Sequence, residues 1–355
     1  MSLAQLLSER LFVPAGMTTA ALCPNTNGLP LPVVGYEGDE KVGYFAATNR
    51  IEWAGDAGIA ASLEDMIAYE KYLDSSLLDP ESIYAETSKQ QKYRDGTLAA
   101  YGYGLGHGQV AGRKIISHGG ALRGFRHSRV QVPSERLNVV LMLNYEVNPG
   151  TVAEYVLHQM LGHKVPELEV FTPGPEWIGE YWDPDTLLYV TVGPADKPGK
   201  LSVKYAGAEE VVTLLTKTSA GCTGMKVILQ GDVLHVERVT DNRILKAKRL
   251  TPVDDVAVSA DYVGTYKCAE ADTILTVTGE DGTLYGSFDG FLGKGPIWLM
   301  RRVSKDIWAL GNPRGMDAGA PGDWTVVFER GAYAEKVYGC TVGCWLARKV
   351  QYERA

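Results

Sequence analysis

The sequence is poor in cysteine and has no long apolar or basic run, and each shortage excludes a class of protein. The five cysteines stand far apart, at positions 23, 222, 268, 340 and 344, an odd number without the spacing of a disulfide framework. No apolar stretch approaches the roughly 20 residues that cross a bilayer. Lys and Arg never occur more than two in a row, and the net charge is −8, which argues against a nucleic-acid partner. We therefore expect a globular protein with reduced thiols, and neither a membrane nor a nucleic acid as partner.

Metal and cofactor motifs are missing as well. The sequence contains no His-Glu-x-x-His, and His158 and His163 stand five positions apart, so they do not share a helical face as zinc ligands would. Residues 106–111 (Gly106-x-Gly108-x-x-Ala111) fit a dinucleotide fingerprint only nominally, because no long helix pattern follows them. We predict no metal and no cofactor. The first residues lack the basic region and apolar core of a signal peptide, which leads us to expect a cytoplasmic location.

The first part of the chain mixes helix and strand patterns. A helix is predicted after Ser62, whose hydroxyl can form a capping box with Asp65. Another follows Asn148 and stops at Gly162. Residues 137–143 form an almost wholly apolar run, typical of a strand buried on both faces. Leucines at positions 3, 6, 7 and 11 share one helical face with nothing before them, so the chain is expected to begin inside a domain.

The pattern of apolar residues changes at about residue 167. There a proline-rich linker leads into short runs of alternating apolar and polar residues, which are typical of antiparallel strands. This part looks duplicated. Residues 177–181 (WIGEY) reappear as residues 262–266 (YVGTY), and residues 244–249 resemble residues 345–350. We therefore predict a partial α+β domain over 1–166, then two small closed antiparallel β-barrels over 167–255 and 256–355. One larger sandwich is the other interpretation of the second part.

The strongest local signal is His118-Gly119-Gly120. Two glycines remove side chains from a strand, so that another backbone, such as a substrate peptide added as an extra strand, can approach closely. The imidazole of His118 would then lie beside the docked carbonyl, where it can donate a hydrogen bond or stabilise charge. Taken alone, these three residues are also compatible with an ordinary turn.

Four short motifs in this order resemble the serine β-lactamase and penicillin-recognising superfamily. They are residues 11–19 (LFVPAGMTT), residues 58–65 (GIAASLED), the glycine-rich residues 101–106 (YGYGLG), and His118-x-Gly120, which matches an active-site motif that reads Lys-Thr-Gly in many members and His-x-Gly in some peptidases and esterases. With two small barrels behind the catalytic domain, the whole chain resembles the D-stereospecific aminopeptidases. These are serine peptidases that release N-terminal D-residues from peptides and amides.

The resemblance implies a small peptide or amide substrate with a free N-terminal amine. It gives His118 an assisting catalytic role and places Gly119 and Gly120 in the substrate-binding strand. In that family a loop of the last barrel reaches into the catalytic cleft and selects for the amine. Here the matching stretch is residues 311–323, whose carboxylates at Asp317 and Asp323 would pair with the substrate ammonium. A homodimer and a separate N-terminal fragment are the protein partners to be expected.

The nucleophile of the superfamily is missing from this sequence. That nucleophile is a serine with a lysine one helical turn later, Ser-x-x-Lys, so that the amine can take the hydroxyl proton. No serine here has a lysine at that spacing, and neither Tyr-x-Asn nor Gly-x-Ser-x-Gly occurs. In the family both the Ser-x-x-Lys and the Tyr-x-Asn motif lie before the segment with which this chain begins. The expectation is an N-terminally truncated D-aminopeptidase-like hydrolase, inactive alone.

Two alternatives stay open at this point. The chain can be a non-catalytic binding module built on two lipocalin-sized barrels, or it can be a β-lactamase or esterase relative.

Overall fold

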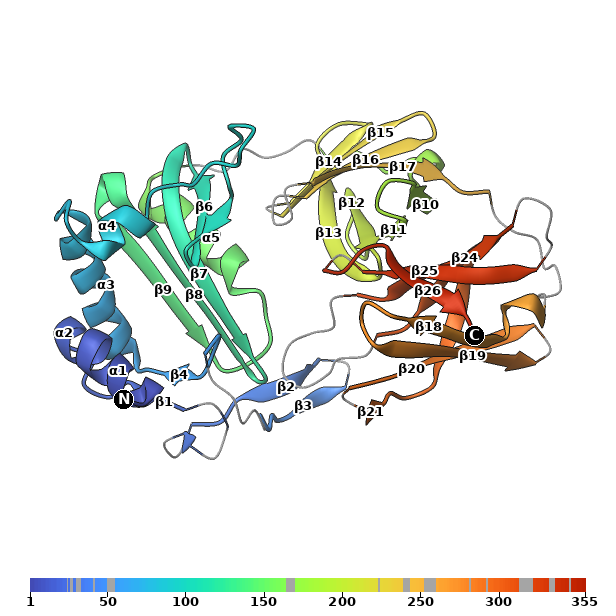
Figure 1. Ribbon diagram of the computed structural model, residues 1–355. Helices are drawn as coiled ribbons and strands as arrows, with labels where there is room; N and C mark the ends of the chain where they lie inside the picture. Colours follow the sequence, from blue (N-terminus) through green and yellow to red (C-terminus); the bar gives the residue numbers. More distant parts are fainter. Residues whose placement is uncertain are drawn as a thin grey trace. The chain divides into compact units, whose positions relative to one another are not determined.

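The computed structural model describes residues 1–355 except 24, 26, 27, 30–32, 41, 50–54, 164–169, 223, 239–242, 252–259, 281, 292, 313–321, 332–335 and 345. The chain divides into two compact units, one ending at Glu167 and the other beginning at Leu168. Figure 1 shows the first unit from blue to green and the second from yellow-green to red. None of the helices in the described part of the chain has the length and hydropathy that crossing a lipid bilayer requires.

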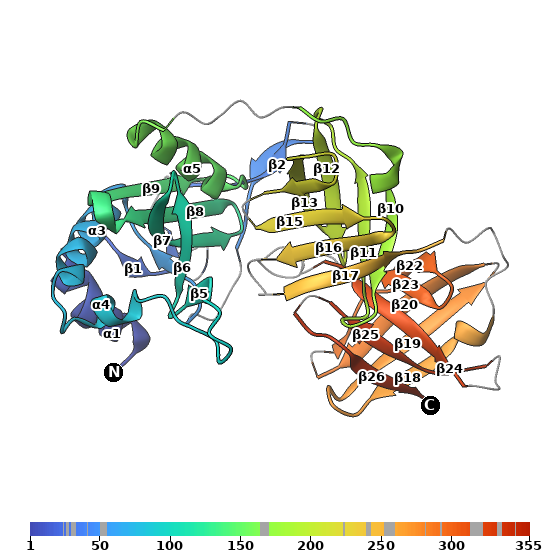
Figure 2. The ribbon, with the colours of Figure 1, turned by 90° about the horizontal axis from the view of Figure 1, so that it is seen from above.

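The first unit is built on a five-stranded antiparallel sheet. The order is β5-β6-β7-β8-β9, with the strands spanning Tyr101–Gly102, Leu105–Val110, Arg113–Leu122, Phe125–Val132 and Leu137–Leu143. A short 3₁₀ turn, Pro133–Glu135, joins the last two strands. Helix α5 (Pro149–Met160) lies along β8 and β9 (Figure 2) and buries Leu157 and Ala153 against valines of the sheet. The other face of the sheet meets α3 (Leu63–Leu77).

Smaller elements complete this unit. They are α1 (Leu3–Leu7), a π-helical turn (Ser8–Phe12), α2 (Val13–Ala15), α4 (Ile83–Thr87), the strand pair β1 (Ala21–Leu22) with β4 (Ile59–Ala60), and the pair β2 (Tyr36–Asp39) with β3 (Gly43–Ala46). Both helices predicted in the first part of the chain are confirmed. Ser62 and Asp65 form the expected capping box of α3, and Asn148 caps α5 through the backbone N–H of Gly150.

The leucine stripe at the start of the chain does not form as predicted. Ser2 caps α1 through a capping box with Gln5, and the helix begins at Leu3. The π-helical turn that follows widens the helix and breaks the predicted face. As a result Leu7 and Leu11 pack against Phe12 and Met66, whereas the leucines at positions 3 and 6 stay exposed.

His158 and His163 do not share a helical face, but the two rings meet in the fold. Helix α5 ends at Met160, and Gly162 adopts a positive φ of 63°, which turns the chain back over the last turn of the helix. The two Nδ1 atoms come within 3.1 Å of each other. Spacing along a helix could not reveal this contact, because His163 lies beyond the end of α5. Among the described residues, no group of three or more His, Cys, Asp or Glu side chains is arranged to hold a metal ion.

The second unit consists of two antiparallel barrels, as predicted: the first has eight strands, and the second is a nine-stranded sheet that closes on itself through an additional strand pairing. The first barrel begins after a 3₁₀ turn (Pro175–Trp177) and closes where its first strand, β10, pairs with its last, β17. Its strands β10 to β17 span Gly179–Asp183, Leu188–Pro194, Lys200–Tyr205, Ala208–Leu214, Ser219–Gly221, Met225–Gln230, Val233–Arg238 and Arg243–Arg249. Because helical turns in the described part of this unit are limited to short 3₁₀ segments, the chain as a whole is mostly sheet, and the α+β class is not confirmed for it.

The second barrel closes where β19 pairs with β20 and β18 with β26. A 3₁₀ turn (Ala260–Tyr262) precedes its strands β18 to β26, which span Gly264–Cys268, Thr273–Glu280, Thr283–Gly290, the two-residue extension Gly293–Lys294, Trp298–Ser304, Ile307–Leu310, Trp324–Arg330, Val337–Gly343 and Val350–Arg354. The five cysteines are all free thiols.

An arginine repeated in both barrels corrects the predicted match of the last strands. Arg249 lies over the ring of Tyr181 and donates to the carbonyl of Ile178 at 2.8 Å. Arg354 lies over Tyr266 in the same way and donates to the carbonyl of Val263 at 2.7 Å. The structure therefore aligns β17 with β26, and residues 244–249 do not correspond to 345–350. The predicted match was wrong because the copies differ in loop length, which similarity of short strands does not reveal.

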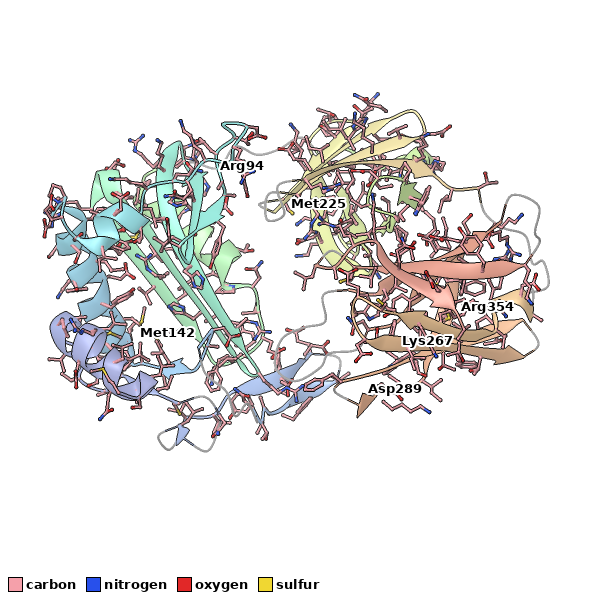
Figure 3. All side chains as sticks on the ribbon, in the orientation of Figure 1. Arg94, Met142, Met225, Lys267, Asp289 and Arg354 are labelled. Atoms are coloured by element: carbon pink, nitrogen blue, oxygen red, sulfur yellow. The ribbon has the colours of Figure 1, made fainter. Side chains whose placement is uncertain are left out.

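The interiors of both barrels are filled by side chains. Trp177, Tyr181 and Met225 are almost wholly buried in the first barrel, and Tyr266 and Trp308 in the second. Met225 is labelled in Figure 3, as is Lys267, which points to solvent from β18. Small barrels are usually filled in this way.

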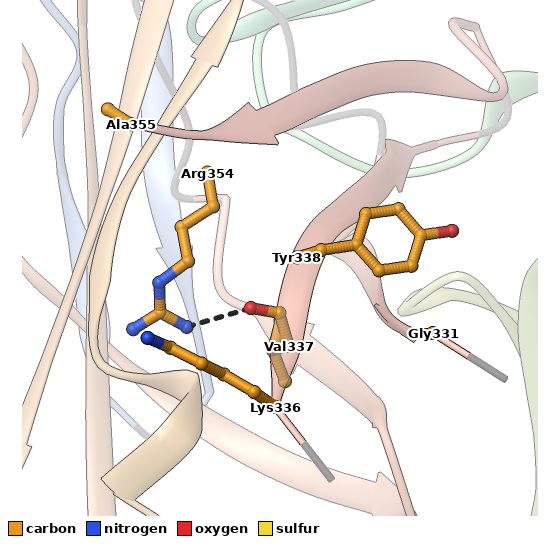
Figure 4. Close-up of a pocket in the computed structure, with 6 residues that line it drawn as sticks. All are labelled: Gly331, Lys336, Val337, Tyr338, Arg354 and Ala355. Carbon is orange, nitrogen blue, oxygen red and sulfur yellow. Dashed lines mark hydrogen bonds between the residues drawn. The ribbon is translucent and has the colours of Figure 1, made fainter. Parts of the chain in front are cut away.

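Two open surface depressions lie on this unit. One, of 470 Å³, is lined by residues from the start of β25 and the end of β26, including Arg354, which donates to the carbonyl of Val337 at 3.1 Å (Figure 4). The other, of 410 Å³, is lined by residues 172–175, 178 and 194–200. Neither contains a residue of the predicted site.

Candidate active site

The three residues of the His-Gly-Gly motif lie toward the end of β7, where that strand has one open edge. On one side β7 pairs with β8 over its whole second half, from Ile116↔Gln131 to Leu122↔Phe125. On the other side its last register partner is Gly106, opposite Ser117. Residues 118–122 thus project beyond β6, and no described strand pairs with their outer edge. An edge of this kind presents unpaired backbone groups to which an extended chain can add.

The two glycines are not required by the protein's own packing. A Cβ atom at Gly119 would lie 3.3 Å from the carbonyl oxygen of His127, and one at Gly120 would lie 3.4 Å from the Cβ of His127. These are close contacts but not overlaps. His118, Gly119 and Gly120 are all exposed. What the glycines provide is a bare surface on an open strand edge, which is what a docking backbone needs.

His118 has one hydrogen-bond partner among the described residues. Its Nε2 lies 2.9 Å from the hydroxyl oxygen of Tyr101, and the two rings are in contact with centroids 5.9 Å apart. Tyr101 belongs to β5, where it is the register partner of Gly106 in β6. Gly106 is also the last residue of β6 that pairs with β7 before the open edge begins. The glycine-rich sequence pattern includes Tyr101 but indicates no role for it. No sequence signal could have found the contact, because it depends on the register of three strands.

A buried ion pair lies next to His118 in the sheet. Arg129 of β8 is the register partner of His118 and binds the carboxylate of Glu70 of α3 at 2.5 and 2.7 Å. Both side chains are only 5% exposed. Burial lowers the pKa of Arg129, but the hydrogen bonds and charge of Glu70 outweigh it and hold the pKa of the guanidinium above its ordinary value. The pair fixes α3 to the strand that backs the open edge.

Two further histidines occupy the same face of the sheet. His107 and His127 are half-buried strand residues, and so is His235 in the first barrel. His127 is the register partner of Gly120. Burial lowers its pKa, and the positive charges of Arg129 and His118 lower it further. Burial also lowers the pKa of His107. Both imidazoles are therefore held toward their neutral forms.

Of the two predicted substrate-binding carboxylates of the last barrel, the structure describes only Asp323. Asp317 lies outside the described residues, with most of its loop. Asp323 accepts a hydrogen bond from the hydroxyl of Tyr189 at 2.9 Å, and its backbone N–H donates to the carbonyl of Ala206 at 2.6 Å. These contacts join the second barrel to the first. Burial, and then the charge of Asp323, raise the pKa of Tyr189. Substrate binding by Asp323 stays a prediction.

Comparisons with known proteins agree with this architecture. The family model "Beta-lactamase" matches residues 1–159, and "D-aminopeptidase, domain B" matches residues 170–353. A D-aminopeptidase of Cereibacter sphaeroides is 41% identical over 354 residues, covering 99% of this chain and 67% of the relative. One of Brucella anthropi is 38% identical over 353 residues, covering 99% of this chain and 66% of the relative. The chain thus spans about two thirds of the length of these relatives.

Solved structures are less similar. The octameric penicillin-binding protein homologue from Pyrococcus abyssi aligns with a TM-score of 0.42 and 18% identity, over 70% of this chain and 60% of its own. A structure titled SurE aligns with a TM-score of 0.35 and 15% identity, over the whole of this chain and 63% of its own. Both scores are too low to support an argument. The two family models and the identity to these relatives show that this chain belongs to the D-aminopeptidase family.

Proposed function

We propose that this chain takes part in the hydrolysis of peptides and amides that carry an N-terminal D-residue, and that it supplies the substrate-docking strand. The observation that carries the proposal is the open edge of β7 at residues 118–122, with a histidine and two glycines on it. It lies in a domain that matches the β-lactamase family model, in a chain whose curated relatives are named D-aminopeptidases.

The proposed reaction begins with an extended substrate that adds to the open edge of β7. The bare positions at Gly119 and Gly120 admit its backbone, and His118 lies beside the scissile carbonyl. A serine hydroxyl then attacks that carbonyl, a base accepts its proton, and the amine leaves with a proton. Water releases the D-residue from the resulting ester. His118 contributes a hydrogen bond to the oxygen on which negative charge develops.

The serine and its base are not among the residues of this chain. Because residues 1–355 contain no Ser-x-x-Lys, we propose that they bind substrate without turning it over, and that hydrolysis requires a segment that carries this motif. Such a segment is the first protein partner of the proposal, and a second copy of the chain is the other. The free thiols support a reducing compartment, and we propose the cytoplasm.

Selection for a free amine is assigned to the carboxylates of Asp317 and Asp323. Since Asp323 is already bound to Tyr189, we propose that Asp317 makes the main ion pair with the substrate ammonium. In the complemented protein, Asp317→Asn should raise KM for D-alanine p-nitroanilide and leave the KM for an N-acetylated substrate unchanged.

Binding is tested on the chain as it stands. Backbone NMR signals of residues 118–122 should shift on titration with D-alanine amide, and L-alanine amide serves as the control ligand. No shift with D-alanine amide at millimolar concentration would contradict the docking role.

Turnover is tested with D-alanine p-nitroanilide and a fluorescent penicillin. Residues 1–355 alone should neither hydrolyse the anilide nor be labelled. Mixing with a polypeptide that carries the family's Ser-x-x-Lys should produce both activities, and the same polypeptide with that serine changed to alanine is the matched control. Hydrolysis by the chain alone would show that the nucleophile has been assigned wrongly.

Neither alternative function has a specific observation in its favour. A lipocalin-like binding module needs an internal cavity, whereas side chains fill both barrels. A β-lactamase activity would appear in the complemented protein as turnover of the penicillin rather than stable labelling, and an esterase activity as hydrolysis of a carboxylic ester.

A further inference from the structure

We propose that Tyr101 is a positioning residue that sets the tautomer of His118, so that the imidazole presents an Nδ1–H donor to the substrate. The inference rests on the proposed function for its purpose, but the tautomer itself is a property of the chain alone. The starting point is the 2.9 Å contact between the Tyr101 hydroxyl and Nε2 of His118, reinforced by contact between the rings.

The direction of this hydrogen bond follows from the acidity of the two groups. A phenol is a good donor with a pKa near 10, and the lone pair of a neutral imidazole nitrogen is a good acceptor. The reverse arrangement would use a much weaker acid, the imidazole N–H, as donor to a poorer acceptor, the phenol oxygen. Tyr101 therefore donates to Nε2. The ring proton of neutral His118 must then lie on Nδ1, since neutral imidazole carries only one.

The tautomer decides what His118 can do at the open edge. With Nε2 occupied by Tyr101, Nδ1 is the ring atom left for a ligand, and no described residue bonds to it. A histidine in the Nδ1–H form can donate to a carbonyl oxygen that is becoming negative, but it cannot accept a proton from a nucleophile at that atom. The geometry thus assigns His118 a donor role and leaves the base to another group.

The charged side chains near His118 do not compete with a substrate for its Nδ1 atom. Arg129, the register partner of His118, is bound to Glu70. His127 lies on the same face and is held toward its neutral form. Tyr101 is 54% exposed, so replacing its hydroxyl by hydrogen removes little packing. Tyr103 lies two residues away, is 70% exposed, and offers a matched control.

The experiment is ¹⁵N NMR of the histidine rings in the full chain at about pH 8.5, two units above the ordinary imidazole pKa. His118→Gln assigns the signal by its loss. We expect the wild type to carry the proton on Nδ1, Tyr101→Phe to shift it toward Nε2, and Tyr103→Phe to change nothing. A wild-type His118 protonated on Nε2, or an unchanged His118 signal in Tyr101→Phe, would overturn the proposal.

A kinetic arm separates this proposal from the proposed function. In the complemented protein, Tyr101→Phe should lower kcat about tenfold or more with little change in KM, because one transition-state donor is misplaced. An unchanged kcat would show that the tautomer has no catalytic purpose. If complementation produces no activity but the NMR result holds, the proposed function fails while the assignment of the tautomer stands.

Discussion

Thr19 and Asp65 lie 46 positions apart and are joined by two hydrogen bonds, from the backbone N–H of Thr19 to Oδ1 at 3.1 Å and from its hydroxyl to Oδ2. Asp65 also accepts from the N–H of Ser62 at 3.0 Å as part of the capping box of α3. One carboxylate therefore serves two of the four family motifs. It closes the N-terminus of α3 and holds the segment after α2 against it.

These hydrogen bonds predict an acid-sensitive contribution to stability. Burial alone would raise the pKa of Asp65, but the bonds from Thr19 and Ser62 lower it to about 2. A lowered pKa stabilises the folded state fully above the ordinary carboxyl value, and this contribution is lost as pH falls from about 4 through 2. Asp65→Asn should lower the free energy of unfolding by about 2 kcal/mol at pH 7 and flatten its pH dependence below pH 4. Urea denaturation across pH 2–7 measures both.

Glu64→Gln is the matched control for this change, because Glu64 is exposed in the same first turn of α3. Its stability curve should run parallel to that of the wild type. Parallel curves for Asp65→Asn and the wild type would instead show that the carboxylate charge contributes nothing.

The buried pair of Glu70 and Arg129 predicts a strongly asymmetric mutational response. Removing one partner leaves an unpaired charge in a site where both side chains are 5% exposed. Glu70→Gln should therefore cost roughly 3–5 kcal/mol of unfolding free energy. The double variant Glu70→Leu with Arg129→Met should recover much of that loss, since no buried charge remains. Thermal and urea unfolding give both values.

An exposed pair supplies the comparison. Arg136 bonds to Asp74 at 2.7 Å, but its side chain is 71% exposed. Asp74→Asn should cost no more than about 1 kcal/mol. Similar losses for Asp74→Asn and Glu70→Gln would rule out burial as the source of the effect.

Gly120 and Gly124 predict opposite consequences of adding a side chain. At Gly120 a Cβ finds only a 3.4 Å contact, so Gly120→Val should change stability by less than about 1 kcal/mol while blocking the open edge. Titration with D-alanine amide should then no longer shift the signals of β7. At Gly124, φ is +78° and a Cβ would lie 2.5 Å from that of Ala47, so Gly124→Ala should lose stability by more than about 1 kcal/mol. Retained ligand binding by Gly120→Val would contradict the docking role of the edge.

Tyr189 and Asp323 predict a link between the barrels. Tyr189→Phe removes the donor to a carboxylate that also lies against Gly207. The unfolding free energy of the second unit should fall by about 1 kcal/mol, because the half-buried carboxylate loses its hydroxyl donor. Tyr285→Phe, at an exposed position of the second barrel, should have no measurable effect. Equal melting temperatures for Tyr189→Phe and the wild type would exclude a stabilising role for the contact.

The two proposals for Asp323 make different predictions in the same variant. If its carboxylate only joins the barrels, Asp323→Asn should weaken stability and leave KM for amine substrates unchanged. If it also binds the ammonium, KM should rise even where the protein is fully folded. The measurement is KM in the complemented protein well below its melting temperature.

Local patterns determined much of this protein. The cap at Ser62, the helix after Asn148, the open-faced glycines after His118 and the two barrels all follow from residues that act on near neighbours, through side-chain capping, the 3.6-residue and two-residue periods, and backbone freedom. The order of four short motifs, together with the missing Ser-x-x-Lys, pointed to the family and to what this chain does not carry.

Tertiary structure alone decided the contacts that span many residues. Tyr101 meets His118, Thr19 meets Asp65, and Arg354 rather than Val350 matches Arg249, because strand register and loop length set these pairs. The meeting of His158 and His163 depended on a single turn at Gly162. A sequence lists which side chains are available at each period of a helix or strand, whereas hydrogen bonding between strands selects which of them face one another across the sheet.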